Sequence, residues 1–262
     1  MSSRRVLGLL AAGAIAAASL LAIPRAHAAN TAMVDVRTKV VYLTFDDGPD
    51  GASTWAVLNV LNRYKAHAVF FEVGKFVSKQ GSILRAINAS GDRIGDHSWS
   101  HLHMANLSRP QVMRELTLAR TAIDTALPGY RVSCFRPPYA STNDTVKEIA
   151  GQLGMKQLLW NLNPVDWASP GATIVDGRIV PLREDAYDPV TPHLLWNLNP
   201  LDQSSPGASA LATRVIAHLR PGSVVLMHDG GGHGFQAAAA LPAILRYIAA
   251  QGWTTGIEPE CR

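Results

Sequence analysis

The sequence lacks an excess of charge of either sign once its first residues are set aside. Its 262 residues include 24 basic and 20 acidic side chains, a formal net charge of +4. Three of the basic residues, Arg4, Arg5 and Arg25, lie within residues 1–28; removing them from the 24 leaves 21, a net charge of about +1. Because there is no basic patch, we expect no nucleic-acid partner.

Cysteine is scarce as well. Cys134 and Cys261 are the two cysteines of the chain, so it can hold at most one internal disulfide. In an exported protein a bond between them is permitted, and it would tie the C-terminus to the segment before residues 135–138. Two buried free thiols fit the sequence equally well, because spacing alone does not show that two cysteines meet.

The N-terminus carries a long apolar run. Arg4 and Arg5 precede apolar residues 6–23, and residues 26–28 (Ala-His-Ala) form a small-x-small cleavage site. This pattern is typical of a secretory signal peptide over residues 1–28, which predicts a protein that is secreted, extracellular or associated with the cell wall, without a stable membrane span. A retained membrane anchor is the alternative, because the run is near spanning length although rich in alanine and glycine.

Residues 29–262 alternate between strand-like and helical patterns. The expected strands are 40–47, 68–73, 93–97, 132–135, 157–162 and 223–227, and the expected helices are 52–64, 83–89, 111–126, 144–153, 210–219 and 237–250. Such alternation predicts an α/β fold of parallel βα units.

Unusual polar residues recur at or just past the C-terminal ends of these strands. They are Asp46, Asp47, His97, Arg136, Asp166 and His228. In a βα barrel these strand ends share one face, and that face carries the active site. Five separate strand ends with such residues are difficult to explain by structural needs alone, so we predict a site there.

The adjacent carboxylates of Asp46 and Asp47 close an apolar strand and precede a Gly-Pro turn. Burying aspartate is costly unless the charge is paired or bound to a metal. Since neighbours on a strand point to opposite sides, one could hold a metal while the other acts as a base. The simpler interpretation is that one of them only caps the turn.

His97 and His101 are spaced i and i+4, which would place both imidazoles on one face of a helical turn. Two histidines and one carboxylate form the three-ligand set of catalytic zinc sites, which leaves a position open for water or substrate. His103 is nearby, and we interpret it as a bystander.

His228 follows an apolar strand and could protonate a leaving group as general acid. That role needs a partner that keeps the imidazole protonated, and Asp166 is the candidate. Arg136 stays charged at any relevant pH and could hold Asp46 as a carboxylate base.

Five segments together resemble the motifs of a known family. Residues 44–49 (TFDDGP), 97–101 (HSWSH), 136–139 (RPPY), 166–167 (DW) and 226–228 (LMH) resemble, in order, the five motifs of the polysaccharide deacetylases, the NodB-homology domain of carbohydrate esterase family 4. The resemblance extends over about residues 38–255 of a single domain, 29–262. It implies a distorted (β/α) barrel of the NodB-homology type and a divalent metal, most often zinc.

The resemblance also implies a role for each matching residue. Asp47, His97 and His101 would bind the metal, and Asp46 would be the base that activates the water on it. The other roles are as follows: Arg136 would orient Asp46, His228 would be the acid, Asp166 would tune it, the backbone N–H of Tyr139 would stabilise the oxyanion, and Trp167 and Leu226 would line a pocket for the acetyl methyl group.

A segmental duplication interrupts the fourth motif. Residues 158–172 recur as residues 194–208 with three changes, 36 residues further on and before the last strands. A single repeat is too few for a solenoid. Either Asp166 with Trp167, or Asp202 with Gln203, can occupy the fourth-motif position, and we favour Asp166 because its copy keeps the tryptophan.

These patterns predict a secreted, monomeric hydrolase that removes acetyl groups from N-acetylglucosamine polymers, either chitin oligomers or peptidoglycan. Two alternatives remain open. One is an esterase that removes O-acetyl groups from a hemicellulose such as xylan. The other is a carbohydrate-binding homologue that is catalytically impaired by the duplication.

Overall fold

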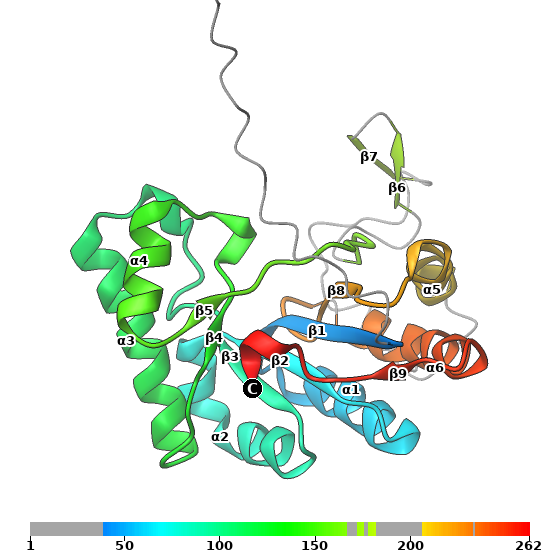
Figure 1. Cartoon of the computed structure of the whole chain (residues 1–262), viewed down its shortest axis with the longest axis horizontal. Helices are drawn as coiled ribbons and strands as arrows, with labels where there is room; N and C mark the ends of the chain where they lie inside the picture. The colour runs from blue at the N-terminus through cyan, green and yellow to red at the C-terminus, as the bar shows by residue number, and fades with distance from the viewer. Residues whose placement is uncertain (1–38, 167–171, 176–177, 182–205, 233) are drawn as a thin grey trace, which may run out of the picture. The chain divides into compact units, whose positions relative to one another are not determined.

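The computed structural model describes residues 39–166, 172–175, 178–181, 206–232 and 234–262 (Figure 1). The predicted signal peptide, Trp167 and the part of the second copy that contains Asp202 lie outside these residues. Within the described part of the chain, no helix combines the length and the apolar character needed to cross a membrane.

A parallel sheet of seven strands forms the centre of the fold (Figure 1). Its order is β5-β4-β3-β2-β1-β8, and β9 also pairs with β1. The strands are β1 (Val40–Gly48), β2 (Ala68–Glu72), β3 (Arg93–Asp96), β4 (Cys134–Phe135), β5 (Lys156–Gln157), β8 (Val224–His228) and β9 (Thr254–Thr255). The sheet curls into the distorted (β/α) barrel that the sequence predicted.

One segment brings the two ends of this sheet together. The sequence predicted a strand over residues 157–162, but β5 ends at Gln157. The chain then leaves β4, where the N–H of Leu158 donates to Phe135, and reaches β8, where Leu162 forms a bridge with Val225. A strand that changes partners in this way cannot pair along its whole length, which explains why β5 is short.

Helices connect the parallel strands. They are α1 (Gly51–Tyr64), α2 (Gly74–Ala89), α3 (Arg109–Ala126), α4 (Asp144–Gln152), α5 (Pro206–His218) and α6 (Gly234–Ala250), with 3-10 turns η1 (Met104–Asn106), η2 (Pro138–Ala140) and η5 (Pro259–Cys261). A two-stranded antiparallel pair, β6 (Ala172–Val175) and β7 (Arg178–Pro181), is separate from the main sheet. α2 packs against α3, and α1 against α6.

Helix α2 is longer than predicted. The sequence predicted a helix over residues 83–89, whereas α2 begins at Gly74. Gln80 has non-helical angles, φ −132° and ψ 34°, which interrupt the apolar period and hide the first half of the helix from sequence analysis.

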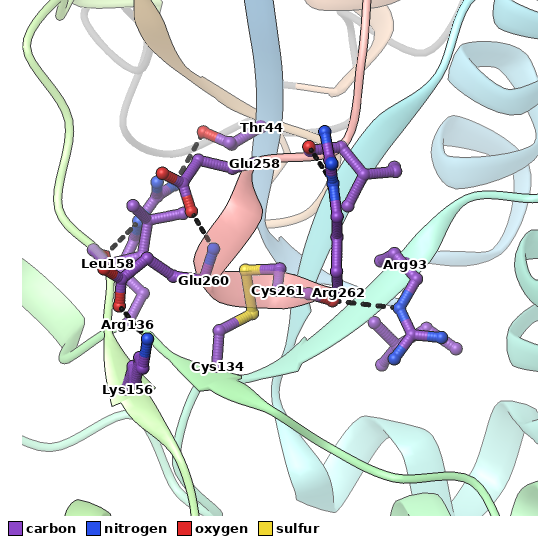
Figure 2. The surroundings of a disulfide bond; sticks show 12 residues. Thr44, Arg93, Cys134, Arg136, Lys156, Leu158, Glu258, Glu260, Cys261 and Arg262 are labelled. Atoms are coloured by element: carbon purple, nitrogen blue, oxygen red, sulfur yellow. Dashed lines mark hydrogen bonds and ion pairs between the residues drawn. A yellow bond between two sulfur atoms is a disulfide. The ribbon is translucent and has the colours of Figure 1, made fainter. Parts of the chain in front are cut away.

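Side chains on opposite faces of β2 belong to two different clusters. Phe70 packs in the large cluster that includes helix residues, while Val69 and Phe71 pack in a smaller one with Cys134 and Cys261. These two cysteines form a disulfide, with their Cα atoms 4.9 Å apart (Figure 2). Of the two alternatives that the sequence left open, the structure therefore has the disulfide, which fastens η5 to β4.

Candidate active site

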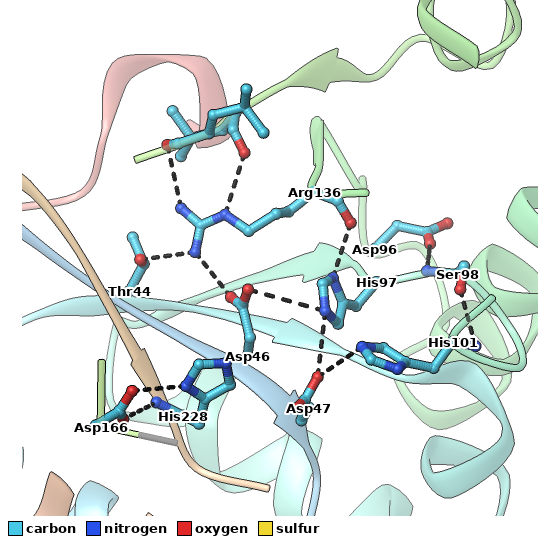
Figure 3. A network of polar contacts seen from close by, with 12 residues as sticks. Thr44, Asp46, Asp47, Asp96, His97, Ser98, His101, Arg136, Asp166 and His228 are labelled. Carbon is cyan, nitrogen blue, oxygen red and sulfur yellow. Dashed lines mark hydrogen bonds and ion pairs between the residues drawn. The ribbon is translucent and has the colours of Figure 1, made fainter. Parts of the chain in front are cut away.

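The polar residues predicted at strand ends lie close together (Figure 3). Asp46 on β1 is in register with His228 on β8, and His97 and Arg136 directly follow β3 and β4. All of these strands run parallel, so their C-terminal ends meet at one edge of the sheet.

Strand β1 changes its geometry where the two carboxylates lie. Asp47 has φ 74°, and the pairing with β2 shifts register between Asp46 and Gly48. As a result, Oδ2 of Asp46 and Oδ1 of Asp47 lie 3.8 Å and 3.3 Å from Nε2 of the same residue, His97. The expectation that the two side chains point to opposite sides is therefore wrong, because the left-handed residue breaks the strand alternation.

The segment 97–101 is a loop, so the helical turn predicted for the two histidines is wrong. Ser98 and His101 have φ of 63° and 60°, and this left-handed backbone turns His101 back toward β1. Its Nε2 lies 2.9 Å from Oδ1 of Asp47. The left-handed loop, and not a helical turn, therefore brings the imidazoles of His97 and His101 together.

Asp47, His97 and His101 fit a divalent cation. Their ligand atoms all lie within 4.8 Å of one another. Oδ1 of Asp47 is buried and receives no well-directed hydrogen bond from the described residues. Burial raises the pKa of Asp47, but the two imidazoles outweigh burial and hold it well below its usual range, so the group is a carboxylate.

The hydrogen bonding of His97 is also compatible with binding a cation. Its Nδ1 lies 2.8 Å from the backbone carbonyl oxygen of Arg136, which can only accept a hydrogen bond. Nδ1 therefore donates, and Nε2, on the side of Asp47, is the nitrogen that could bind a cation. A second hydrogen bond of this kind is the usual way in which a metal-binding histidine is oriented.

Arg136 is fully buried and contacts Asp46 directly. Its Nη1 donates to Oδ1 of Asp46 at 2.7 Å and to Oγ1 of Thr44 at 2.8 Å. The other guanidinium nitrogens donate to the carbonyl oxygens of Leu158 and Leu159. A guanidinium satisfied on all sides has one orientation, and it fixes that of the Asp46 carboxylate.

On the other side of Asp46, His228 is paired with Asp166. Nδ1 of His228 lies 2.8 Å from Oδ1 of Asp166, and the His228 backbone N–H donates to Oδ2 at 2.7 Å. Burial lowers the pKa of His228, but the charge and hydrogen bond of Asp166 outweigh it and raise the pKa to about 9. The ring is therefore protonated at neutral pH. Asp202, the alternative partner, lies outside the described residues.

Tyr139 lies at the rim of the site, with φ 57° and 60% of its surface exposed. Its ring is 4.6 Å from that of His101 and stacks on His103 at 4.1 Å, so His103 contacts the rim although it is not in the group that could hold a metal. Among the described residues, none accepts a hydrogen bond from the Tyr139 backbone N–H. Leu226 is buried on β8.

A pocket of about 480 Å³ opens beside Asp47 and His101. The start of α2 lines this pocket; Phe76 there is 37% exposed, and the Lys75 ammonium lies 4.9 Å from the centre of its ring. Gly231 also lines the pocket. An exposed aromatic ring next to a polar site suits the apolar face of a sugar ring.

Two buried carboxylates near the site were not identified from the sequence. Burial raises the pKa of Glu72 well above its usual range and that of Asp229 to about 7. Both flank Gly48: a Cβ there would overlap the carboxylate of Asp229 and lie 2.7 Å from Oε2 of Glu72. A glutamate that interrupts the apolar run 68–73 was the signal available in the sequence.

Comparison with protein families gives one match, to the model described as polysaccharide deacetylase, over residues 34–158. A chitooligosaccharide deacetylase of Bradyrhizobium is 31% identical over 193 residues, which cover 74% of this chain and 72% of the relative. A peptidoglycan-N-acetylmuramic acid deacetylase of Bacillus subtilis is 38% identical over 144 residues, 55% of this chain. This chain spans 30% of the length of that Bacillus protein.

Solved structures show the same fold. A family 4 carbohydrate esterase from Streptomyces lividans, solved in complex with acetate, superposes with a TM-score of 0.64 and 28% identity. The match covers 84% of this chain and 93% of that structure. The similarity therefore extends well beyond the residues of the site.

Proposed function

This chain belongs to the polysaccharide deacetylase family, and from that membership we propose that it hydrolyses acetyl groups of N-acetylglucosamine-containing polymers, either chitin oligomers or peptidoglycan. The observation that carries the proposal is that a candidate base and a candidate acid lie next to one ligand set. Asp46 is held by Arg136, and His228 is held by Asp166.

We assign Asp47, His97 and His101 as ligands of a divalent cation, and we propose zinc because two imidazoles and one carboxylate form its catalytic ligand set. When bound, such an ion polarises a carbonyl and lowers the pKa of water. The remaining chemistry belongs to residues of this protein.

Amide hydrolysis needs a base, an acid and a donor to the oxyanion. Asp46 takes the proton from the attacking water through Oδ2, because Arg136 occupies Oδ1. The backbone N–H of Tyr139 donates to the oxygen of the tetrahedral intermediate. His228, protonated at neutral pH, gives its proton to the leaving nitrogen, so that an amine and acetate are released.

We also propose that the protein is exported, which the apolar N-terminal run and the disulfide support. The measurement is the N-terminal sequence of the protein recovered from the medium or the cell wall. A mature chain that begins at Ala29 is expected, and an intact Met1 on protein that stays with the membrane would contradict cleavage.

The deciding experiment measures acetate released from chitin pentasaccharide by purified protein, first stripped of metal and then supplied with zinc. Release that ceases on stripping and returns with zinc is expected. The same assay on peptidoglycan and acetylxylan assigns the polymer. Release from acetylxylan alone would replace the proposal by an O-acetyl esterase, and no release from any polymer by zinc-loaded protein would indicate the catalytically impaired homologue.

A further inference from the structure

The loop that carries His97 and His101 has a backbone conformation that its own residues disfavour. Ser98 and His101 both lie in the left-handed region, which residues other than glycine seldom adopt. Residues in such conformations persist where surrounding contacts fix them. The contacts around this loop therefore determine where the His101 imidazole lies.

The first half of the loop is held from α2. The N–H of Gly74 donates to the carbonyl oxygen of Ser98 at 2.9 Å, and the N–H of Lys75 donates to that of Trp99 at 3.1 Å. Within the loop, the N–H of His101 donates to Oγ of Ser98 at 3.1 Å. These contacts leave Ser100, the residue directly before His101, to be held from another element.

Glu115 on α3 holds Ser100 with both of its carboxylate oxygens. Oε2 accepts the backbone N–H of Ser100, and Oε1 accepts its hydroxyl, each at 2.8 Å. Glu115 is 9% exposed, and in the described part of the chain it forms no ion pair. Burying a carboxylate without a counter-ion is energetically unfavourable, so we expect Glu115 to have a specific role.

We propose that Glu115 is a positioning residue for the metal site: through Ser100 it directs the imidazole of His101 toward Asp47. The inference rests on the cation site proposed above. A displacement of Ser100 would move His101 with it, and the bonds from Glu115 to the Ser100 backbone N–H and hydroxyl oppose that displacement. Contacts of this kind behind metal ligands typically change affinity 10- to 100-fold.

The test is the zinc affinity of the metal-free protein, measured by competition with a chelating dye. Glu115→Gln keeps the shape of the side chain but loses its charge and one acceptor, and we expect zinc binding at least about tenfold weaker. Ser100→Ala removes one of the two bonds and should weaken zinc binding about threefold. The double variant should lose no more than Glu115→Gln alone, because both changes act on one contact.

The control is Glu148→Gln, which removes a glutamate from an exposed pair with Arg109 and should leave the zinc affinity unchanged. The visible spectrum of the cobalt-loaded protein should change in Glu115→Gln and remain as in wild type in the control. A folded Glu115→Gln protein with wild-type zinc affinity and cobalt spectrum would overturn the proposal. If that variant does not fold, an unaltered affinity of Ser100→Ala overturns it. A wild type that binds no zinc would overturn the cation site itself.

Discussion

Among its neighbours, Asp166 does most to favour the protonated form of His228. Its pKa of about 9 lies above the ordinary value of 6.5, because the charge of Asp166 outweighs burial. The protonated ring therefore contributes stability that is fully present below pH 6.5 and is lost as the pH rises through about 9. Activity that needs His228 as an acid should fall over the same upper range.

Asp166→Asn is expected to move the high-pH limb of kcat/KM down by about two units, because burial favours the neutral ring and Asp166 supplies most of the charge that offsets burial. At pH 8 this corresponds to a loss of roughly tenfold in the protonated fraction. NMR titration of His228 in the metal-free protein measures the pKa directly. If Asp202→Asn moves the limb and Asp166→Asn does not, the second copy of the duplicated segment supplies the fourth motif.

Phe76 is expected to bind the sugar ring next to the reacting one. Phe76→Ala should raise KM for chitin pentasaccharide roughly fivefold with little change in kcat, since an aromatic contact of this kind is worth about 1 kcal/mol. Hydrolysis of p-nitrophenyl acetate, which has no sugar, should be unaffected. Trp55 is 40% exposed, close to the 37% of Phe76, and is not among the residues of this pocket, so Trp55→Ala is the control. Equal effects of the two variants would exclude the subsite.

Among the elements, the turn after β8 lies directly against the end of β1. A Cβ on Gly230 would overlap the backbone of Asp47. Gly230→Ala must therefore displace a proposed metal ligand, and we expect zinc affinity and activity to fall more than about tenfold. Both are measured on the purified variant.

Gly151 in α4 provides the matched control, because a Cβ there meets no atom within 4 Å. Gly151→Ala should raise the free energy of unfolding by up to about 1 kcal/mol and leave zinc affinity unchanged. Wild-type zinc affinity in Gly230→Ala would mean that the turn yields without moving Asp47.

The sequence predicted most elements because their signals are local. Strand β1 and helix α3 have the apolar pattern of their type, and the capping box of Ser108 and Gln111 marks the start of α3. The loop 97–101 was predicted as a helical turn because two histidines spaced i and i+4 share a face in a helix. The spacing itself does not show whether the backbone is helical. Its left-handed residues carry no glycine or asparagine signal.

The functional residues that sequence analysis did not identify make contacts between elements that are separated along the chain. Glu115 lies on a helix of ordinary pattern, and its partner Ser100 is 15 residues earlier. Glu72 and Asp229 meet at Gly48 only because β2, β1 and β8 are neighbours in the sheet. Strand ends can be predicted from sequence, whereas contacts between elements require the register that the fold supplies.

In the molecule as a whole, the disulfide joins residues 127 positions apart. Closing so long a loop restricts the unfolded chain, so the variant Cys134→Ser/Cys261→Ser should lose about 3–5 kcal/mol of unfolding free energy. Urea denaturation monitored by circular dichroism measures the loss. Wild type in reductant should match the variant.

The disulfide should also matter for catalysis. Cys134 precedes Arg136 by two residues, and the charge of Glu258, near the fastened C-terminus, acts on the Arg136 guanidinium (Figure 2). We expect kcat of the double variant to fall further than its zinc affinity. An equal loss in both would indicate a general loosening of the fold.

The order of strands has a consequence for biosynthesis. Asp46 lies on the first strand and His228 at the end of β8, yet the two strands are direct neighbours. A ribosome has therefore passed residue 228 before base and acid can meet, so a shorter nascent chain is inactive. A product truncated before residue 224 would lack β8 and β9, so the apolar β1 would become an exposed edge strand. Such a fragment should aggregate.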